Sequence, residues 1–303
     1  MATRWTAEPE RWAIIDHSAL AHNIDTIAQW VKPAQVMAVV KADGYGHGAI
    51  EVAQTAVAAG ATWIGTAHVQ EALALRGAGI TAPLLAWLHT IKTPFRAAIE
   101  HNIDIGISGP EIEAVAEAAR AADLPARVHL KIDTGLSRNG CPAHLWDDLC
   151  IETLAAVEAG AVEAVAIWSH LASADEPDDP ANAHQAAVFE AAVDRARALG
   201  LTVDIRHLAN SAAALGQPDL RHNLVRVGIA AYGVDPADAH LAERAGVHLH
   251  PVMRLRAQLL ATKAAATGTG VSYGHTWTAP DATVLGLVGL GYADGVPRAV
   301  GNS

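Results

Sequence analysis

Few cysteines, a shortage of basic residues and the lack of a long apolar run each exclude a class of protein. The 303-residue sequence has two cysteines, Cys141 and Cys150, so cysteine alone can build neither a disulfide framework nor a four-ligand zinc site. Its 21 lysines and arginines face 32 aspartates and glutamates, and the resulting net charge of −11 repels nucleic acids and anionic membranes. We therefore expect a protein of a reducing compartment whose partner is a small molecule.

Apolar segments of the kind that target or anchor a protein are also lacking. Residues 1–10 contain no apolar core of the signal-peptide type. Each later apolar run is broken by charge before it is long enough to span a bilayer. The sequence therefore predicts a cytoplasmic protein with neither nucleic acid nor a membrane as a partner.

From about residue 36 the sequence alternates short apolar or β-branched runs with alanine-rich stretches of helical spacing. The runs predict strands at 36–40, 62–65, 84–88, 103–107, 127–132, 164–169, 203–207 and 224–227. The stretches between them predict helices, among them 53–59, 111–122, 145–159 and 185–199. Eight such units within roughly 200 to 250 residues predict an α/β protein with a (β/α)8 barrel, and a doubly wound parallel sheet is the alternative.

The pattern changes after Gly233, where the polar stretch 235–246 is followed by β-forming segments without long helices. We therefore expect the barrel at 13–237 and a smaller, mostly β domain at 238–303. Within that domain, 253–261 and 283–288 are expected to be antiparallel strands. Residues 1–12 are expected to be a separate N-terminal segment that packs with the β domain.

Polar residues follow several predicted strands, at the edge where barrel enzymes carry their sites. Lys41 directly follows the first strand and precedes a glycine-rich turn. Partial burial there would lower the pKa of its amine and favour the neutral form that reacts with a carbonyl cofactor. The alternative is a lysine whose stem lies along the strand and whose head reaches water.

The loops after the seventh and eighth strands occupy the position where this fold binds phosphate. Asn210 and Ser211 open an alanine-rich helix there and supply a hydroxyl and free backbone amides, and Gly228 permits close approach of the backbone. Three more side chains fall at the same edge: Arg138, His170 and Arg226. Each alone is usually structural, so their shared location is what indicates a site.

All four tyrosines, Tyr45, Tyr232, Tyr273 and Tyr292, lie within three residues of a glycine. A phenol presented from a glycine-rich loop suits phosphate contact or proton transfer. Tyr232 is equally well explained as a residue that caps a strand end, which leaves the other three as candidates.

Three other patterns carry no function in this interpretation. The glycines of 289–295 have the wrong spacing for a dinucleotide loop. The acidic stretch 175–179 is interpreted as a solvated loop, with a metal site there as the less favoured alternative. The 16 histidines are scattered, so we expect no metal centre and interpret most of them as surface or packing residues.

Seven ordered segments resemble the pyridoxal 5′-phosphate (PLP)-dependent alanine racemases, whose fold is a (β/α)8 barrel followed by a β domain. The segments are 40–48 (VKADGYGHG), 131–140 (KIDTGLSRNG), 169–175 (SHLASAD), 207–211 (HLANS), 226–228 (RVG), 271–274 (VSYG) and 291–295 (GYADG). The resemblance implies an isomerase that interconverts L-alanine and D-alanine, and thereby supplies D-alanine for peptidoglycan precursors.

The resemblance also implies a role for each matching residue. Lys41 would hold PLP as an internal aldimine and act as acid or base on one face of the substrate, with Tyr273 on the opposite face. Two bases are the simplest way to invert a stereocentre. Family members take this tyrosine from a neighbouring subunit, which implies a homodimer.

Further roles follow from the same resemblance. Arg226 would face the pyridine nitrogen, His170 would link Tyr273 to Arg226, and Tyr292 would line the substrate entry. Arg138 would meet the substrate carboxylate, steadied in some relatives by a carbamylated lysine at the position of Lys131. The phosphate would be held near Asn210 by a cradle of four residues: Tyr45, Ser211, Gly228 and Ile229.

The sequence departs from the family in three places. Asp43-Gly44 replaces the commoner Asn-Ala, and His275 and Trp277 are bulkier than expected, which bears on substrate range. Relatives continue beyond Ser303, so the resemblance implies a β domain that is incomplete in this chain.

Several alternatives stay open. They are a broad-specificity amino-acid racemase, a PLP decarboxylase and a non-catalytic PLP-binding protein. Alanine is favoured because the sequence offers no identifiable acidic pocket residue for a basic side chain.

Overall fold

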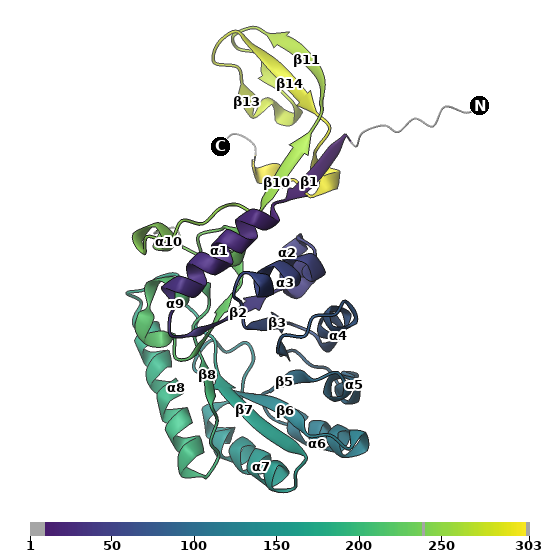
Figure 1. Ribbon diagram of the computed structural model, residues 1–303. Coiled ribbons are helices and arrows are strands. Elements are labelled where there is room, and N and C mark those ends of the chain that lie inside the picture. The colour runs from purple at the N-terminus through teal and green to yellow at the C-terminus, as the bar shows by residue number, and fades with distance from the viewer. Residues whose placement is uncertain (1–9, 238–239, 301–303) are drawn as a thin grey trace, which may run out of the picture. The chain divides into compact units, whose positions relative to one another are not determined.

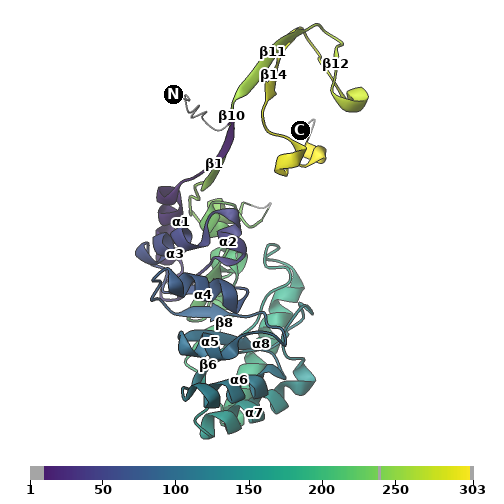
Figure 2. The same ribbon diagram turned by 90° about the vertical axis from the view of Figure 1, so that its right-hand side faces the viewer.

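The computed structural model describes residues 10–237 and 240–300, which belong to two compact units (Figures 1 and 2). One unit is Asp16–Val252. The other joins the described residues 10–15 to residues 253–300. Among the described residues, no helix combines the length and the apolar character needed to cross a membrane.

Eight parallel strands form the sheet of the larger unit. They are β2 (Gln35–Val39), β3 (Trp63–Thr66), β4 (Leu84–Ala86), β5 (Ile103–Ile107), β6 (Ala126–Lys131), β7 (Val162–Trp168), β8 (Ile205–His207) and β9 (Leu224–Val227). Their hydrogen-bonded order is β8-β7-β6-β5-β4-β3-β2-β9. Beside the two end strands, the Arg226 amide donates to the Ala209 carbonyl at 3.0 Å, so the barrel is nearly closed. The predicted barrel is confirmed, and every strand lies within two residues of its expected bounds.

Helices accompany these strands, with the longer ones on the outside of the sheet and α2 a short left-handed turn beside the cavity (Figure 1). They are α1 (His17–Trp30), α2 (Lys41–Gly46), α3 (Ala49–Ala58), α4 (Val69–Gly77), α5 (Phe95–Glu100), α6 (Glu111–Ala122), α7 (Trp146–Glu158), α8 (Pro180–Ala198), α9 (Ser211–Gly216) and α10 (Leu241–Arg244). In α6 the buried residues Ile112, Val115, Ala116 and Ala119 follow helical spacing, so one apolar stripe faces the sheet. The same spacing accounts for the helices predicted from the sequence.

Large side chains fill the interior of the barrel, and small residues on the neighbouring strands leave the space that these side chains occupy. Met37, Trp63 and Leu85 belong to one buried cluster inside the sheet. Trp87 packs against it, and a Cβ added at Gly65 would lie 2.7 Å from the Trp87 ring. Glycine at this position of β3 therefore makes room for a tryptophan that reaches the carboxyl end of the barrel.

The smaller unit is built from antiparallel pairs. They are β1 (Arg11–Ile15) with β10 (Met253–Ala257), β11 (Leu259–Ala265) with β14 (Thr283–Val288), and β12 (Gly270–Val271) with β13 (Trp277–Thr278). The strand predicted at 253–261 is therefore two strands. Of the N-terminal segment predicted at 1–12, residues 1–9 lie outside the described residues, and residues 11 and 12 pair with β10.

The two units divide after Val252, beyond the boundary expected at residue 237. The polar stretch that suggested the earlier boundary contains α10, whose Leu241 and Ala242 are buried. The Asp235 carboxylate accepts a hydrogen bond from the Ala242 amide at 2.8 Å. A polar sequence therefore joins the larger unit because its two apolar residues face inward.

Candidate active site

A cavity of about 280 Å³ opens at the carboxyl ends of the barrel strands. Its wall brings together ten of the residues singled out from the sequence: Lys41, Tyr45, Lys131, Arg138, His170, Asn210, Ser211, Arg226, Gly228 and Ile229. They come from loops far apart in the chain, as expected for a barrel whose parallel strands end at one edge.

Lys41 begins a short turn of left-handed backbone. The next four residues, from Ala42 to Tyr45, all have positive φ, between 51° and 61°. Glycine adopts this conformation freely, but each of the three other residues costs roughly 1–2 kcal/mol. The Gly44 amide donates to the Val40 carbonyl at 2.8 Å, and the Asp43 carboxylate accepts from the Ala49 amide at 2.9 Å. The surrounding structure thus maintains a strained turn at the site.

Glu71, which the sequence analysis missed, holds this turn from α4. One carboxylate oxygen accepts the Ala42 amide at 2.7 Å, and the other accepts the amides of Ala67 and His68, each at 2.9 Å. The available signal was the position of Glu71 at the third residue of a helix, where it closes a capping box. Its contact with the lysine turn could not be anticipated.

The Lys41 amine is partly buried, and burial is the largest cause of a pKa below its ordinary value. The charge of Arg138 lowers this pKa further, and the charge of Glu71 opposes the shift. The amine lies 5.7 Å from the centre of the Tyr45 ring. A larger share of the amine is therefore neutral and nucleophilic than for a lysine in water.

Tyr45, Ser211 and Gly228 form a small concave surface beside this lysine. The Ser211 hydroxyl oxygen accepts the Gly228 amide at 3.0 Å, so its hydrogen is available for donation. A Cβ at Gly228 would lie 2.7 Å from the Tyr45 hydroxyl, so glycine is what lets the phenol approach the backbone. Asn210 caps α9 by accepting the Ala213 amide. Hydroxyls and backbone amides gathered in this way suit the oxygens of a phosphate.

Arg226 is a buried guanidinium in the cavity wall, 4% exposed. Its Nη1 donates to His207 Nδ1 at 3.0 Å and to the His207 carbonyl at 2.8 Å. Its Nη2 donates to the carbonyls of Ser169 and Leu208 and to His170 Nδ1. The Nε hydrogen has no protein partner within the described part of the chain, so it remains for a ligand.

Burial lowers the pKa of Arg226 to about 9. His170 accepts from Arg226 through Nδ1, so its neutral ring carries the hydrogen on Nε2. Burial, and then the charge of Arg226, hold the pKa of His170 far below its ordinary value. The pair therefore presents two donors, one from each residue.

Lys131 lies deeper, with its amine donating to the Asn139 side-chain oxygen at 2.6 Å. Burial, followed by the charges of Arg226 and Arg138, lowers its pKa to about 7. The amine also sits 4.4 Å from the centre of the Trp168 ring. A substantial fraction is thus neutral at neutral pH, which is the reactive form of an amine.

The charges around the cavity have one predominant sign. Lys41, Lys131, Arg138 and Arg226 all line it, and Asp175 is the one carboxylate among the lining residues described. A cationic cavity in a chain of net charge −11 selects an anionic ligand. Asp175 is exposed, as expected for the loop 175–179, but it also reaches the cavity wall, which the sequence analysis did not foresee.

Two tryptophans of the wall were also missed. Trp87 and Trp168 both line the cavity. Trp168 stacks on His207 with ring centres 5.3 Å apart, and the Arg226 guanidinium lies 5.0 Å from a Trp168 ring centre. For Trp168, the only signal in the sequence for a place in the cavity wall was its position at a strand end, directly before the Ser169-His170 pair.

The other tyrosines have different positions. Tyr273 and Tyr292 belong to the smaller unit, where they are 76% and 60% exposed. Tyr232 is buried, and its hydroxyl donates to the Val39 carbonyl at 3.0 Å, in keeping with a structural role. Burial raises the pKa of the Tyr232 phenol above its ordinary value.

Comparison with known proteins gives one consistent family. The model described as "Alanine racemase, N-terminal domain" matches residues 15–236, and "Alanine racemase, C-terminal domain" matches residues 252–303. The alanine racemase of Streptomyces coelicolor is 48% identical over 297 residues, which are 96% of this chain and 76% of the relative. That of Thermobifida fusca is 47% identical over 291 residues, 96% of this chain and 77% of the relative.

Solved structures agree. The alanine racemase of Streptomyces lavendulae has a TM-score of 0.91 and 42% identity, covering 96% of this chain and 76% of that one. The alanine racemase of Bartonella henselae with covalently bound pyridoxal phosphate has a TM-score of 0.81 and 27% identity, covering 96% of this chain and 78% of that one.

Proposed function

The chain belongs to the alanine racemase family of PLP-dependent isomerases, which interconvert L-alanine and D-alanine, and we propose how its own residues carry out that reaction. The observation that carries the proposal is the position of Lys41. Its amine shares one cavity with the Tyr45–Ser211–Gly228 surface and with the free Nε hydrogen of Arg226. An aldehyde, a phosphate and a ring nitrogen each have a complementary group there.

In this proposal the barrel unit holds the cofactor. Lys41 binds PLP covalently, while Tyr45, Ser211, Gly228 and Ile229 hold its phosphate near Asn210. When bound, PLP draws electrons away from the α-carbon of the amino acid joined to it, which makes the α-proton acidic. Arg226 donates its Nε hydrogen to the pyridine nitrogen. Because a guanidinium can only donate, Arg226 would suit a pyridine nitrogen that carries no proton.

Arg138 binds the substrate carboxylate. Lys131 steadies it as a carbamate, since the neutral amine favoured by a pKa of about 7 is the form that adds carbon dioxide. A carbamate on Lys131 would place a negative charge near Arg138 and Arg226, where the protonated amine places a positive one. That change offsets part of the repulsion that now lowers the pKa of Lys131.

Two bases act on opposite faces of the α-carbon. Lys41 exchanges a proton on one face, and Tyr273 exchanges a proton on the other, with the Nε2 hydrogen of His170 directed to the Tyr273 oxygen. The proposed unit is a homodimer in which Tyr273 completes the neighbouring subunit's site. The 76% exposure of Tyr273 is compatible with that role, and Tyr292 then lines the substrate entry.

We also propose that the enzyme works in the cytoplasm and supplies D-alanine for peptidoglycan precursors. The free, buried thiols of Cys141 and Cys150 support a reducing compartment. We assign PLP binding to the larger unit, Asp16–Val252, and the contribution of Tyr273 to the smaller unit, which includes residues 253–300.

Incubation with L-alanine in deuterated water tests the two-base assignment. The wild type is expected to form D-alanine carrying deuterium at the α-carbon. Amine formation would indicate a decarboxylase, and a yellow but inert protein would indicate a PLP carrier. Tyr273→Phe is expected to keep the cofactor colour and to exchange the α-proton of one enantiomer only, because a single base remains. Racemisation at the wild-type rate by Tyr273→Phe would refute the assignment.

A further inference from the structure

A continuous chain of polar side chains runs from Arg226 through the barrel interior. His207 Nδ1 lies 3.0 Å from Arg226 Nη1, and His207 Nε2 lies 3.1 Å from His129 Nδ1. His129 Nε2 lies 3.0 Å from the carboxylate of Asp104. Both imidazoles are fully buried, and Asp104 is 2% exposed. Three strands, β5, β6 and β8, therefore supply an uninterrupted path between the cavity and Asp104.

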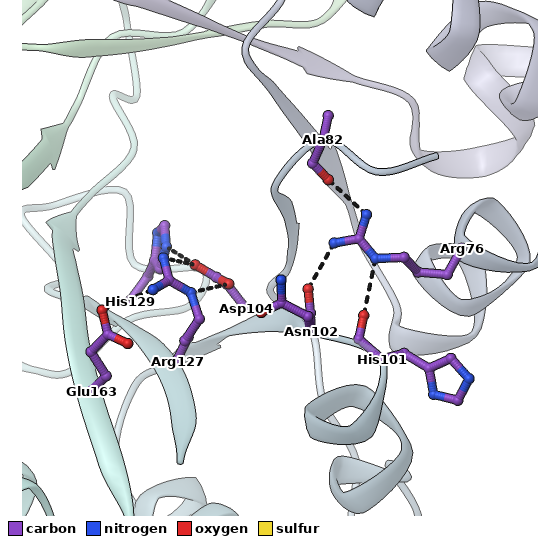
Figure 3. Close-up of polar contacts among 8 residues, drawn as sticks. All are labelled: Arg76, Ala82, His101, Asn102, Asp104, Arg127, His129 and Glu163. Carbon is purple, nitrogen blue, oxygen red and sulfur yellow. Dashed lines mark hydrogen bonds and ion pairs between the residues drawn. The ribbon is translucent and has the colours of Figure 1, made fainter. Parts of the chain in front are cut away.

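Beyond Asp104, the path of polar side chains continues through Arg127 to Glu163 (Figure 3). Arg127 donates to Asp104 from Nε at 3.0 Å and to Glu163 from Nη1 at 2.8 Å. Glu163 is 56% exposed, and among the described residues the side-chain partners of His129 are Asp104 and His207, not Glu163. Two carboxylates thus share one guanidinium, but only one of them touches the histidine chain.

The two ends fix the direction of every hydrogen bond. A carboxylate can only accept and a guanidinium can only donate. Asp104 accepts from His129 Nε2, so His129 Nδ1 accepts from His207 Nε2, and His207 Nδ1 accepts from Arg226. Both rings are then neutral with every ring nitrogen paired, and burial and the charge of Arg226 do lower the pKa of His207 well below its ordinary value.

We propose that Asp104 is a positioning residue for the racemase reaction, acting through His129 and His207 to hold the guanidinium of Arg226. This rests on the proposed donation from Arg226 Nε to the pyridine nitrogen. The direct partners of Arg226 are carbonyls and imidazoles, and within the described residues no carboxylate contacts it. Asp104 is the first anion reached along the chain.

Loss of the Asp104 acceptor leaves two arrangements of the hydrogens on His129 and His207. Neither arrangement gives every donor an acceptor. If His129 keeps its hydrogen on Nε2, a buried donor is unpaired. If both histidines reverse, the Nδ1 hydrogen of His207 faces the donating Nη1 of Arg226. The second arrangement pushes the guanidinium from its place, so the effect of Asp104 is transmitted to the cavity without contact with any ligand.

Three variants separate this role from simple packing. Asp104→Leu removes the acceptor, and His129→Leu cuts the chain while leaving the Asp104–Arg127–Glu163 contacts in place. Glu163→Gln is the matched control, because it removes the other carboxylate on Arg127 and leaves the histidine chain intact. Asp104→Asn retains an oxygen acceptor and is the conservative rescue.

Nitrogen-15 NMR of labelled histidines in the apoenzyme reads the chain directly, with His207 assigned from His207→Gln. Wild type and Glu163→Gln are expected to show His207 with hydrogen on Nε2 alone. Asp104→Leu is expected to lose this single His207 tautomer, and His129→Leu serves the same purpose if Asp104→Leu does not fold. Asp104→Asn is expected to restore the tautomer. An unchanged His207 tautomer in either leucine variant would overturn the proposal.

The holoenzyme provides the second measurement. Both leucine variants are expected to reduce kcat about tenfold with KM for alanine within about twofold, as for a weakened hydrogen bond to a charged group. Glu163→Gln is expected to match the wild type. Wild-type kcat in a leucine variant with an altered His207 tautomer would also contradict the proposal. A wild type that binds no PLP at Lys41 would refute the proposed function instead, since the apoenzyme spectra do not depend on it.

Discussion

A methyl group added at Gly228 would collide with the hydroxyl of Tyr45, and the size of that collision can be worked out from the structure. The new Cβ would lie 2.7 Å from Tyr45 Oη, 3.4 Å from Tyr45 Cζ and 3.9 Å from Val39 Cβ. Carbon atoms do not approach an oxygen to 2.7 Å without displacement, so Tyr45 must move. Overpacking of this kind costs about 1–3 kcal/mol.

Gly228→Ala is therefore expected to lower the unfolding free energy of the apoenzyme by about 1–3 kcal/mol in a urea titration. It is also expected to weaken PLP binding about tenfold, because about 1.4 kcal/mol of lost phosphate contact corresponds to that factor. Gly109→Ala is the control, since nothing lies within 4 Å of a Cβ built there.

Tyr45→Phe provides the decisive partner variant. It removes the atom at 2.7 Å and leaves Cζ, at 3.4 Å, as the nearest neighbour of the new methyl group. In a double-mutant cycle, Gly228→Ala and Tyr45→Phe should therefore be less destabilising together than their sum, by about 1–2 kcal/mol. Strict additivity would refute the reasoning, because it would mean that the phenol and the backbone at 228 are not in contact.

Three further perturbations test other parts of the site. Lys131→Met is expected to stabilise the apoenzyme by about 1 kcal/mol at pH 6 and less at pH 9, in urea titrations. The pKa of Lys131 is about 7 in the folded state and 10.5 in the unfolded state, so burial of its charge lowers the free energy of unfolding most below pH 7, and this effect declines as pH rises toward 10.5. Equal stabilisation by Lys131→Met at pH 6 and pH 9 would contradict this. Glu71→Gln removes the charge that raises the pKa of Lys41, so the acidic limb of PLP attachment should move to lower pH, with a loss of about 1 kcal/mol in stability; an unchanged acidic limb would show that the charge of Glu71 does not act on this amine. Gly44→Ala, at a φ of 61°, should destabilise by about 1–2 kcal/mol, while Gly77→Ala in α4 should be neutral or stabilising by up to about 1 kcal/mol; equal effects of the two changes in thermal unfolding would exclude a left-handed turn at 44.

The barrel could be predicted from the sequence because its strands are buried on both faces. Such strands appear as short apolar runs between turns, so all eight were found. The site residues of the barrel could be grouped because parallel strands all end at one edge. Lys41 and Arg226 are an example, since each lies at the carboxyl end of its own strand.

The parts that could not be predicted depend on side-chain direction inside the barrel. His129 and His207 are 78 residues apart and carry no local signal, and they were included among the packing histidines. They meet because β6 and β8 flank β7. Glu71 was missed for a related reason, since its contact with Ala42 exists only if the lysine turn is left-handed, a conformation that L-residues avoid.

The division of the chain at residue 252 shows a third limit. Polar composition suggested a linker, whereas two buried apolar residues, Leu241 and Ala242, decide that this stretch folds with the barrel. Composition averages over a segment, but burial is decided residue by residue.

The central claim is that PLP is attached to Lys41 and not to Lys131, the other lysine of the cavity with a lowered pKa. Borohydride reduction of the holoenzyme followed by peptide mapping identifies the attached lysine directly. A pyridoxyl group is expected on the peptide that contains Lys41 and on no other. A group on the peptide that contains Lys131, or no modified lysine in a protein that racemises alanine, would contradict it.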